Sequence, residues 1–326
     1  VDHTWTRAAR IINRRGSGPI PHRVQRYNTR CADLLAVSGS VYVLSLVAAL
    51  LWGVGPSLTK RGIVNGGTSL QGSLVVVGVG LVSYLAATAA TGGLAGLSRL
   101  SPTTYAVFLA SGALGAFSWL VYFAAVDRLG ASVGEAGFTT HPLIATVVAL
   151  VVLGEALSPL TALGVTVVVA GLVVVAASDG GDREGWQLYE LGFPLSAAAA
   201  HAVSNVVRRF GLTRTPVTTL EAITVNVVAT FLVLILYAAA TRQRALRPSP
   251  GSFRYFLGSG LVSAVAFLLL FEAFARGSVA VVSAIAGLAP VFATVVAAVF
   301  LADVERVTRG VVAGVTLVFA GVVLIT

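Results

Sequence analysis

Ten long stretches without a charged residue dominate the 326-residue chain. They cover residues 34–59, 62–98, 100–126, 136–154, 156–178, 191–207, 222–241, 255–271, 277–302 and 310–326. Each stretch can hold one helix of roughly 20 residues, the length that the hydrocarbon core of a bilayer requires. Inside lipid, a helix pairs its backbone donors and acceptors within its own segment. The sequence therefore predicts ten membrane-spanning helices.

The composition agrees with an all-α integral membrane protein. Hydrophobic residues make up 56% of the chain and charged residues 11%, whereas about a quarter of the residues of a soluble domain are charged. The uncharged stretches show no strict alternation of apolar and polar residues, so the roughly 10-residue alternating strands of a membrane β-barrel are not expected. The fold class that follows is all-α and embedded in a membrane.

The charge and the motif content narrow the possible partners. The net charge is +9, and in a membrane protein such an excess is typical of cytoplasmic loops and of contact with lipid headgroups. We therefore expect membrane lipid, and no nucleic acid, as the partner of these charges. Cys31 is the only cysteine, which excludes an internal disulfide and a metal site built from thiolates. Nothing resembles a Walker loop or an HExxH zinc motif, so we expect no catalytic residue, no metal and no cofactor.

The second half of the chain echoes the first. HPLIATVVALVVLGE at residues 141–155 has a near copy, APVFATVVAAVFLAD, at residues 289–303. A constant offset of 148 residues relates Gly112 to Gly260, Phe123 to Phe271, Arg128 to Arg276 and Pro142 to Pro290. The offset is 149 near the start, where Trp52 corresponds to His201, and 150 near the end, where Gly164 corresponds to Gly314 and Gly171 to Gly321. A unit of five helices is therefore duplicated.

Because five is an odd number, two units that both span the membrane completely must have opposite orientations. Such inverted repeats are typical of secondary transporters, whose substrate site lies near the midplane where the repeats meet. We place the first repeat at residues 38–178 and the second at residues 179–326. Residues 1–37 form a basic tail, which we expect to be flexible, and which is either an arm that binds lipid headgroups or a solvated tail.

The order of motifs in each unit resembles the EamA family of the drug/metabolite transporter superfamily. Trp52-Gly53 lies in the first helix, a proline lies early in the fourth helix and an acid ends it. GEALSPLTALGVTVVVAGLVVV and DVERVTRGVVAGVTLVFAGVVLI resemble the ends of that family's two repeats. The resemblance covers about residues 38–326. Two positions depart from it: Ala302-Asp303 replaces Gly-Glu, and His141 stands where an acid often precedes the proline.

The resemblance implies a secondary transporter that exports a small organic metabolite or a drug-like compound by alternating access. It also implies a multi-pass protein of the plasma membrane with both termini in the cytoplasm. The distribution of Lys and Arg between loops favours this orientation only when the tail is counted. The alternative is a membrane scaffold or accessory subunit that transports nothing, in which the duplication serves packing alone.

A polar stripe follows the sixth uncharged stretch. Spacings of 4, 7, 4 and 3 residues align one set of side chains on a single helix face: Glu190, Pro194, His201, Asn205 and Arg208. A charge at the centre of a spanning helix costs about 2.5 to 3.5 kcal/mol, so this face is expected to meet protein or water. We assign His201 and Asn205 to a substrate cavity, together with Trp52 at the equivalent place in the first helix. The alternative for His201 and Asn205 is an interhelical hydrogen-bonded pair.

Aromatic side chains and a histidine are further candidates for this cavity. Trp119 and Tyr122 are three residues apart on the third helix and either form an aromatic wall for an apolar or cationic substrate or belong to an interfacial belt. His141 lies near the start of the fourth helix, beside Pro142. We count all three residues among the cavity residues.

Two acids, Glu135 and Glu272, are also counted among the cavity residues as candidate proton sites, and protons are a possible coupling ion. Glu135 opens the fourth helix, where burial would raise its pKa into a useful range. The alternative is an interfacial position at which the helix dipole favours a negative charge. Glu272 and Arg276 are four residues apart, a spacing typical of a local ion pair, with proton binding by Glu272 as the alternative.

The recurring prolines and glycines predict motion and packing. Pro142 and Pro290 each remove a backbone donor and free a carbonyl about one turn back, so each is either a hinge beside the substrate site or an ordinary packed kink. Glu155 and Asp303 follow these helices and are interpreted as structural acids. The glycines of the fifth and tenth helices predict close packing, either within the chain or across a homodimer.

Overall fold

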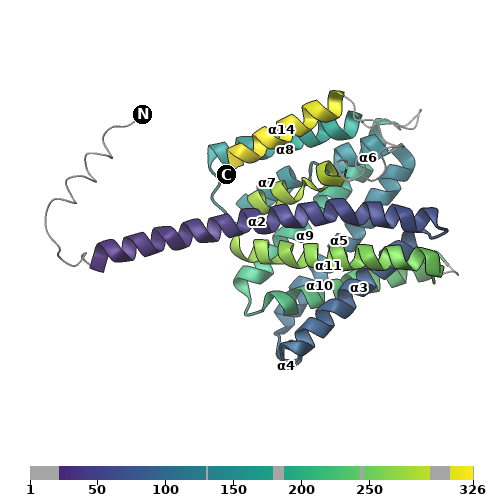
Figure 1. The fold of residues 1–326 in the computed structure, drawn as a ribbon, viewed down its shortest axis with the longest axis horizontal. Coiled ribbons are helices and arrows are strands. Elements are labelled where there is room, and N and C mark those ends of the chain that lie inside the picture. The colour runs from purple at the N-terminus through teal and green to yellow at the C-terminus, as the bar shows by residue number, and fades with distance from the viewer. Residues whose placement is uncertain (1–21, 130, 179–186, 243–245, 294–308, 326) are drawn as a thin grey trace. The chain divides into compact units, whose positions relative to one another are not determined.

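The computed structural model describes residues 22–129, 131–178, 187–242, 246–293 and 309–325. The chain divides into two compact units, residues 1–39 and residues 40–326. Residues from His22 onward are helical, so the part of the expected tail from 22 to 37 is helical, and residues 1–21 lie outside the described ranges. The second unit holds the helices of both repeats from residue 40 onward (Figure 1).

The regular elements that the structure describes are all helices. The first repeat contains α2 (His22–Val64), α3 (Ser69–Ala90), α4 (Leu94–Leu97), α5 (Pro102–Leu129), α6 (Ala131–Phe138), α7 (His141–Leu153) and α8 (Pro159–Ser178). The second contains η1 (Leu188–Leu191), α9 (Gly192–Arg214), α10 (Thr219–Ala240), α11 (Pro250–Arg276), α12 (Val279–Ala286) and α14 (Arg309–Ile325). Residues 289–293 are also helical. Each of the ten uncharged stretches therefore contains a helix.

Six helical segments of the described chain are long and apolar enough to cross a membrane. They are Gly39–Val64, Ser69–Ala90, Pro102–Leu129, Val133–Leu153, Thr219–Ala240 and Pro250–Arg276. Shorter apolar helices occupy Pro159–Val174, Val279–Ala293 and Ala313–Ile325. The remaining stretch corresponds to α9, which has 23 residues but carries the polar stripe.

The same pattern of hydrogen bonds caps the N-termini of equivalent helices in the two repeats. Thr68 and Gln71 form a capping box at the start of α3, and Thr218 and Glu221 form one at the start of α10. In each box the threonine hydroxyl accepts from a backbone N–H three residues on, while the Gln or Glu side chain accepts from the threonine N–H. The two boxes are 150 residues apart. The duplication therefore extends to the way in which the helices begin.

The fourth helix of each repeat is interrupted just before its proline. Thr139-Thr140 separates α6 from α7, and the equivalent dipeptide, Gly287-Leu288, follows α12. In each gap the first N–H donates to the carbonyl four residues back, at 2.8 Å and 3.0 Å. Both interruptions lie beside Pro142 and Pro290, where the sequence predicts a hinge or a kink. The role of these prolines as hinges stays a prediction.

Equivalent residues of the two repeats make reciprocal contacts. Gly62 on α2 lies against the ring of Phe256 on α11, and Gly211 on α9 lies against the ring of Phe108 on α5. Gly62 corresponds to Gly211 at an offset of 149, and Phe108 to Phe256 at an offset of 148. The pair α2 and α11, which lie side by side in Figure 1, therefore packs as the pair α9 and α5 does.

Side-chain hydrogen bonds across the same two helix pairs are reciprocal as well. The Ser259 hydroxyl donates to the Gly55 carbonyl at 3.0 Å, and the Ser204 hydroxyl donates to the Ser111 carbonyl at 2.7 Å. Gly55 corresponds to Ser204 and Ser111 to Ser259. The donor lies on α11 in the first pair and on α9 in the second, although α9 is the equivalent of α2. The position of the contact is therefore the same in both pairs, and the helix that donates differs.

The last helices of the two repeats, α8 and α14, pack on each other through glycines. Gly164 lies against Gly321, and Gly171 lies against Gly314. Because residue numbers rise on one helix as they fall on the other, the two helices are antiparallel. The predicted glycine face therefore packs within the chain.

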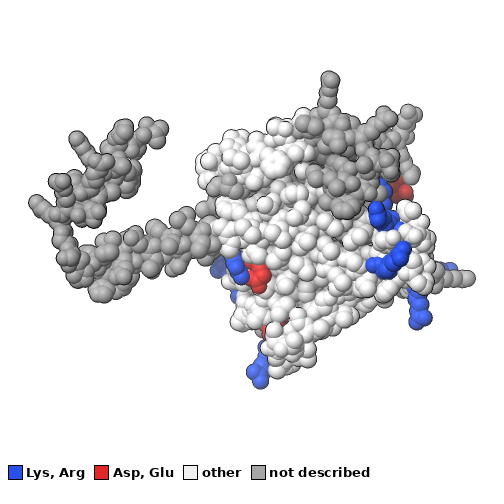
Figure 2. All heavy atoms as spheres, viewed as in Figure 1, with Lys and Arg blue, Asp and Glu red and all other residues white. Residues whose placement is uncertain are grey.

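Charged side chains on the visible surface lie toward the ends of the helices (Figure 2). On the face shown in Figure 2, the described Lys, Arg, Asp and Glu atoms lie toward the left and right ends of the long helices, and the surface between them is uncharged. Large apolar side chains are exposed along the helices, among them Val82, Val151, Leu236 and Val323. Such a surface is stable in lipid, where exposed apolar groups are not in contact with water.

Candidate functional site

The polar stripe of α9 turns its central residues toward other helices. Asn205 is 2% exposed and Arg208 is 3% exposed. Glu190 lies apart from them on η1, where its carboxylate accepts from the Gln187 N–H at 2.9 Å. The interior position of Asn205 and Arg208 agrees with the prediction that this face avoids lipid.

His201 belongs to a cluster of rings, which we call the aromatic cluster: Trp119, Tyr122, Phe138, His141 and His201. The rings of His141 and His201 are 4.7 Å apart, and those of Tyr122 and Phe138 are 4.8 Å apart. The ring of Phe138 lies 5.4 Å from that of His201, and the ring of Trp119 lies 6.4 Å from it. The cluster joins α5, α6 and α7 of the first repeat to α9 of the second.

His141 occupies a backbone site that its neighbouring proline creates. Pro142 has no N–H, so it cannot donate to the Phe138 carbonyl four residues back. The Nδ1 atom of His141 lies 3.2 Å from that carbonyl oxygen and can donate to it in the tautomer with Nδ1 protonated. An ionised acid, which often stands at this position in the resembling family, could not donate, and the histidine therefore fits the freed carbonyl.

Glu135 is bound to the aromatic cluster through Tyr122. The Tyr122 hydroxyl on α5 donates a hydrogen bond to the Glu135 carboxylate on α6. Glu135 itself belongs to this short half-helix, which ends at the break before Pro142. Glu135 is therefore held against α5, in the same cluster of side chains as His201.

Trp52 lies in a second ring pair that is equivalent to part of the aromatic cluster. The rings of Trp52 and Phe267 are 6.0 Å apart, and those of His201 and Trp119 are 6.4 Å apart. Trp52 corresponds to His201 at an offset of 149, and Trp119 to Phe267 at an offset of 148. Equivalent positions of both repeats therefore carry a ring pair, one with two apolar rings and one with a histidine.

Arg208 lies against Phe267 of the second ring pair and was not among the predicted site residues. Its Nη1 donates to Asn205 Oδ1 at 2.7 Å, and Asn205 Nδ2 donates to Ser283 Oγ at 3.4 Å. The guanidinium carbon lies 5.1 Å from the ring centre of Phe267 and 5.7 Å from that of Phe271. The signal in the sequence was its place on the stripe, one turn beyond Asn205.

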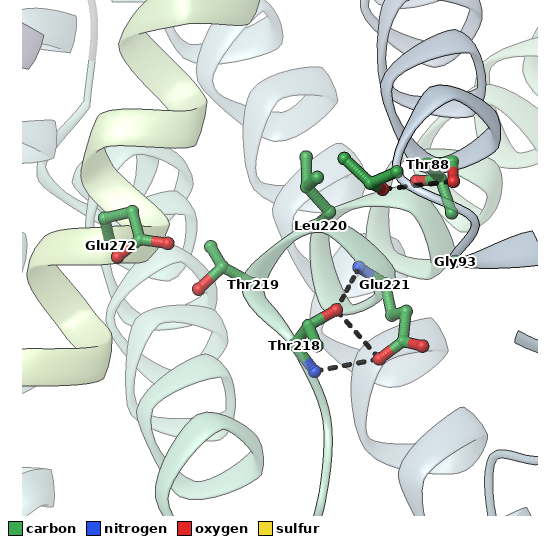
Figure 3. A pocket seen from close by; sticks show the side chains of 8 residues that line it. Thr88, Gly93, Thr218, Thr219, Leu220, Glu221 and Glu272 are labelled. Carbon is green, nitrogen blue, oxygen red and sulfur yellow. Dashed lines mark hydrogen bonds between the residues drawn. The ribbon is translucent and has the colours of Figure 1, made fainter. Parts of the chain in front are cut away.

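Glu272 lies elsewhere. It forms an ion pair with Arg276, with 2.7 Å between Nη2 and Oε2, as the spacing of the two residues predicts. It also lines an open pocket of about 340 Å³ at the ends of α3 and α10, with Thr88, Thr91, Gly93, Thr218, Thr219, Leu220 and Glu221. Figure 3 shows Glu272 on one side of this pocket and the capping box of Thr218 and Glu221 on the other. Of the predicted site residues, Glu272 therefore lines this pocket, whereas His201 and Asn205 lie on the face of α9 that contacts other helices.

Glu155 joins the end of one repeat's fourth helix to the other repeat. Its Oε1 accepts from Arg209 Nε at 3.3 Å, and its Oε2 accepts from the Val279 N–H at 2.9 Å. Arg209 Nη1 also donates to the Phe274 carbonyl at 2.6 Å. These bonds agree with a structural role for Glu155, while its equivalent, Asp303, lies outside the described residues.

The grouped side chains offer apolar rings, one guanidinium and one carboxylate, but no group of three metal-ligating side chains occurs among the described residues. Comparisons with known proteins give a family and a fold. A model of the EamA-like transporter family matches residues 39–177 and 189–326. A solved structure described only as "Crystal structure of protein" is similar at a TM-score of 0.74 and 20% identity, covering 88% of this chain and 96% of that one. No curated protein matches the chain.

Proposed function

This chain belongs to the EamA-like transporter family, and from that membership we propose that it is a secondary transporter that exports a small organic compound by alternating access. It is a multi-pass membrane protein, and its family is one of transporters rather than enzymes. The proposal adds ten membrane spans, inverted repeats, a plasma-membrane location and cytoplasmic termini. A metabolite or a drug-like compound is the proposed substrate class.

The reciprocal contacts support inverted repeats. Helices α8 and α14 are equivalent by their 150-residue offset, and they pack antiparallel through glycines. Equivalent helices that run in opposite directions are what a rotation of near 180° about an axis in the membrane plane produces. The same relation accounts for the matched ring contacts of Gly62 with Phe256 and of Gly211 with Phe108.

The observation that carries the proposal is the pair of interrupted helices at equivalent positions. Discontinuous helices near the interface of two repeats are a feature of transporter substrate sites. Here one interruption adjoins the aromatic cluster, and Ser283 on α12, the half-helix before the other, lies at the end of the hydrogen-bonded chain from Arg208. Rocking of these half-helices would expose the residues of α9 to one side of the membrane and then to the other.

Protons are the proposed coupling ion, and Glu135 is the proposed proton site. It lies on the interrupted helix, and its contact with the Tyr122 hydroxyl joins that helix to α5. A carboxylate in this setting can bind a proton when the surrounding helices close and release it when water enters. The pairing of Glu272 with Arg276 makes Glu272 a weaker candidate.

A proteoliposome uptake panel tests this function. The purified full chain is reconstituted, and a set of labelled amino acids, organic acids and cationic drugs is offered with and without a pH gradient. Uptake above that of protein-free liposomes, and its change with the gradient, is the expected result. A chain that transports no member of the panel under either condition would instead fit a membrane scaffold or accessory subunit.

A further inference from the structure

Arg208 is a buried cation whose charge is not matched by an acid among the described residues. The ion pairs that the structure describes use other arginines: Arg209 with Glu155, Arg276 with Glu272, and Arg128 with Glu190. The Nε atom of Arg208 is buried and has no hydrogen-bond partner in the described chain. An uncompensated charge at such depth is costly, so a counter-charge is expected from another source.

The neighbours of Arg208 compensate its charge only in part. The Asn205 side-chain oxygen accepts one hydrogen bond at 2.7 Å, and the rings of Phe267 and Phe271 present their faces to the guanidinium. All three groups are neutral. A planar guanidinium can form two parallel hydrogen bonds to a carboxylate, a sulfonate or a phosphate, and the unbonded Nε edge is one side of that fork.

The equivalent position of the first repeat shows that packing does not require a cation there. Arg208 corresponds to Thr59 at an offset of 149. The Thr59 hydroxyl is paired with the Ser259 hydroxyl at 2.9 Å, a neutral and satisfied contact. The scaffold therefore accommodates a small neutral side chain at this place, and the cation of the second repeat calls for a separate explanation.

We propose that Arg208 binds an anionic group of the transported compound. The inference rests on the proposed transport function and gives its substrate a chemical class: an organic anion with an apolar body. The anion takes the Nε edge, and the rings of Trp52 and Phe267 on one side and of His201 and Trp119 on the other contact the apolar part. Because Arg208 is 3% exposed, the anion reaches it only when the helices around α9 separate.

Gly115 on α5 packs directly against the guanidinium of Arg208. Gly115 faces the guanidinium so closely that an added Cβ would stand 2.9 Å from Nη2. A side chain at this position would compete with an anion for the same edge. An anion therefore reaches this edge only when α5 and α9 separate, and the lack of a side chain at Gly115 then leaves the edge clear.

The test is ligand binding to the purified full chain in nanodiscs, measured by the shift of its melting temperature and by titration calorimetry. The probes are matched pairs of an anion and its neutral isostere: benzoate with benzamide, benzenesulfonate with benzenesulfonamide, and acetate with acetamide. At least one anion is expected to bind roughly tenfold or more tightly than its neutral isostere, because a hydrogen bond to a charged group is worth at least that ratio.

Arg208→Gln should abolish the preference for the anion, and Arg208→Lys should keep part of it, because a lysine retains the charge but not the fork. Arg254→Gln, which removes an exposed arginine of α11, serves as the matched control and should keep the full preference. If Arg208→Gln does not yield folded protein by size-exclusion chromatography, Arg208→Lys alone decides, through a reduced ratio of anion to neutral affinity.

Two outcomes overturn the inference: no anion in the panel binds more tightly than its neutral partner, or the preference persists unchanged in both Arg208 variants. Transport of a neutral or cationic compound in the proteoliposome panel together with either outcome would leave the proposed function standing. Anion binding lost in Arg208→Gln, combined with no transport, would refute the function while keeping the site.

Discussion

The interrupted helices of the two repeats have the same backbone hydrogen bond at the interruption but differ in their side chains. At the same backbone position, Glu135 of α6 stands where α12 has Ser283, and both carbonyls accept from the N–H four residues on. His141 stands where the second repeat has Ala289. Turns, caps and ring contacts are duplicated, whereas Glu135, the two histidines and the buried Arg208 each have a residue of another kind at the equivalent position. We interpret the features present in both repeats as requirements of the fold, and the side chains present in one repeat as parts of a single substrate site.

The same separation holds for α2 and α9. Trp52 and His201 are equivalent, and each contacts a ring of the opposite repeat. Arg208 replaces Thr59, and Asn205 replaces Pro56. At these two positions α9 carries a charged group and α2 does not. We interpret this face of α2 as one that serves packing alone, and the equivalent face of α9 as one that also binds substrate.

The largest expected difference is between Arg208 and Thr59. Arg208→Gln should lower the initial transport rate about 100-fold, since removing one partner of a buried charged contact costs about 2 to 5 kcal/mol. Thr59→Val removes a neutral hydrogen bond and should cost about 1 kcal/mol of stability with little loss of transport. Initial rates in proteoliposomes, corrected for reconstituted protein, check both. Equal losses in the two variants would contradict the assignment of function to α9.

The second contrast is between Glu135 and Ser283. Glu135→Gln should abolish the effect of a pH gradient on uptake while exchange of substrate across the membrane persists, because the amide cannot bind and release a proton. Ser283→Ala, at the equivalent position, should leave the gradient dependence intact. Uptake driven by an imposed gradient, compared with counterflow without one, separates these effects. Unchanged coupling in Glu135→Gln would reduce Glu135 to a structural partner of Tyr122.

The smallest expected effect concerns the duplicated scaffold itself. Gly171→Ala places a Cβ about 2.7 Å from the Gly314 carbonyl oxygen and should destabilise the fold by roughly 1 to 3 kcal/mol through overpacking. Gly192→Ala introduces a Cβ with no atom within 4 Å and should be close to neutral. Melting temperatures in detergent measure the difference, and no difference would mean that α8 and α14 do not pack through their glycines.

Much of the fold could be predicted from the sequence because its signals are local. The uncharged stretches place a helix in each of ten positions, and the offsets of 148 to 150 residues identify which helices correspond. The repeated proline marks both interruptions. Membership in the EamA family is confirmed by the match over residues 39–177 and 189–326.

The site was less predictable because it depends on contacts between distant segments. Spacing on one helix could not show that Tyr122 would bind Glu135, or that His141 would meet His201. It placed Arg208 on the polar stripe, but only the packing of α5, α9 and α11 reveals that this arginine lacks an acid among the described residues. Glu272 was grouped with the cavity although it lines a pocket at the helix ends, because its position along the chain does not reveal which surface it faces.

The proposed mechanism requires the α9 face to open to each side of the membrane in turn, which cysteine labelling can detect. Asn205→Cys is made in a Cys31→Ser background and treated with a membrane-impermeant maleimide on right-side-out and on inside-out vesicles. The matched control is Asn65→Cys, in the exposed turn after α2. Alternating access predicts labelling of residue 205 from both sides and of residue 65 from one side only. Residue 205 labelled from neither side, or from one side alone, would contradict alternating access at this face.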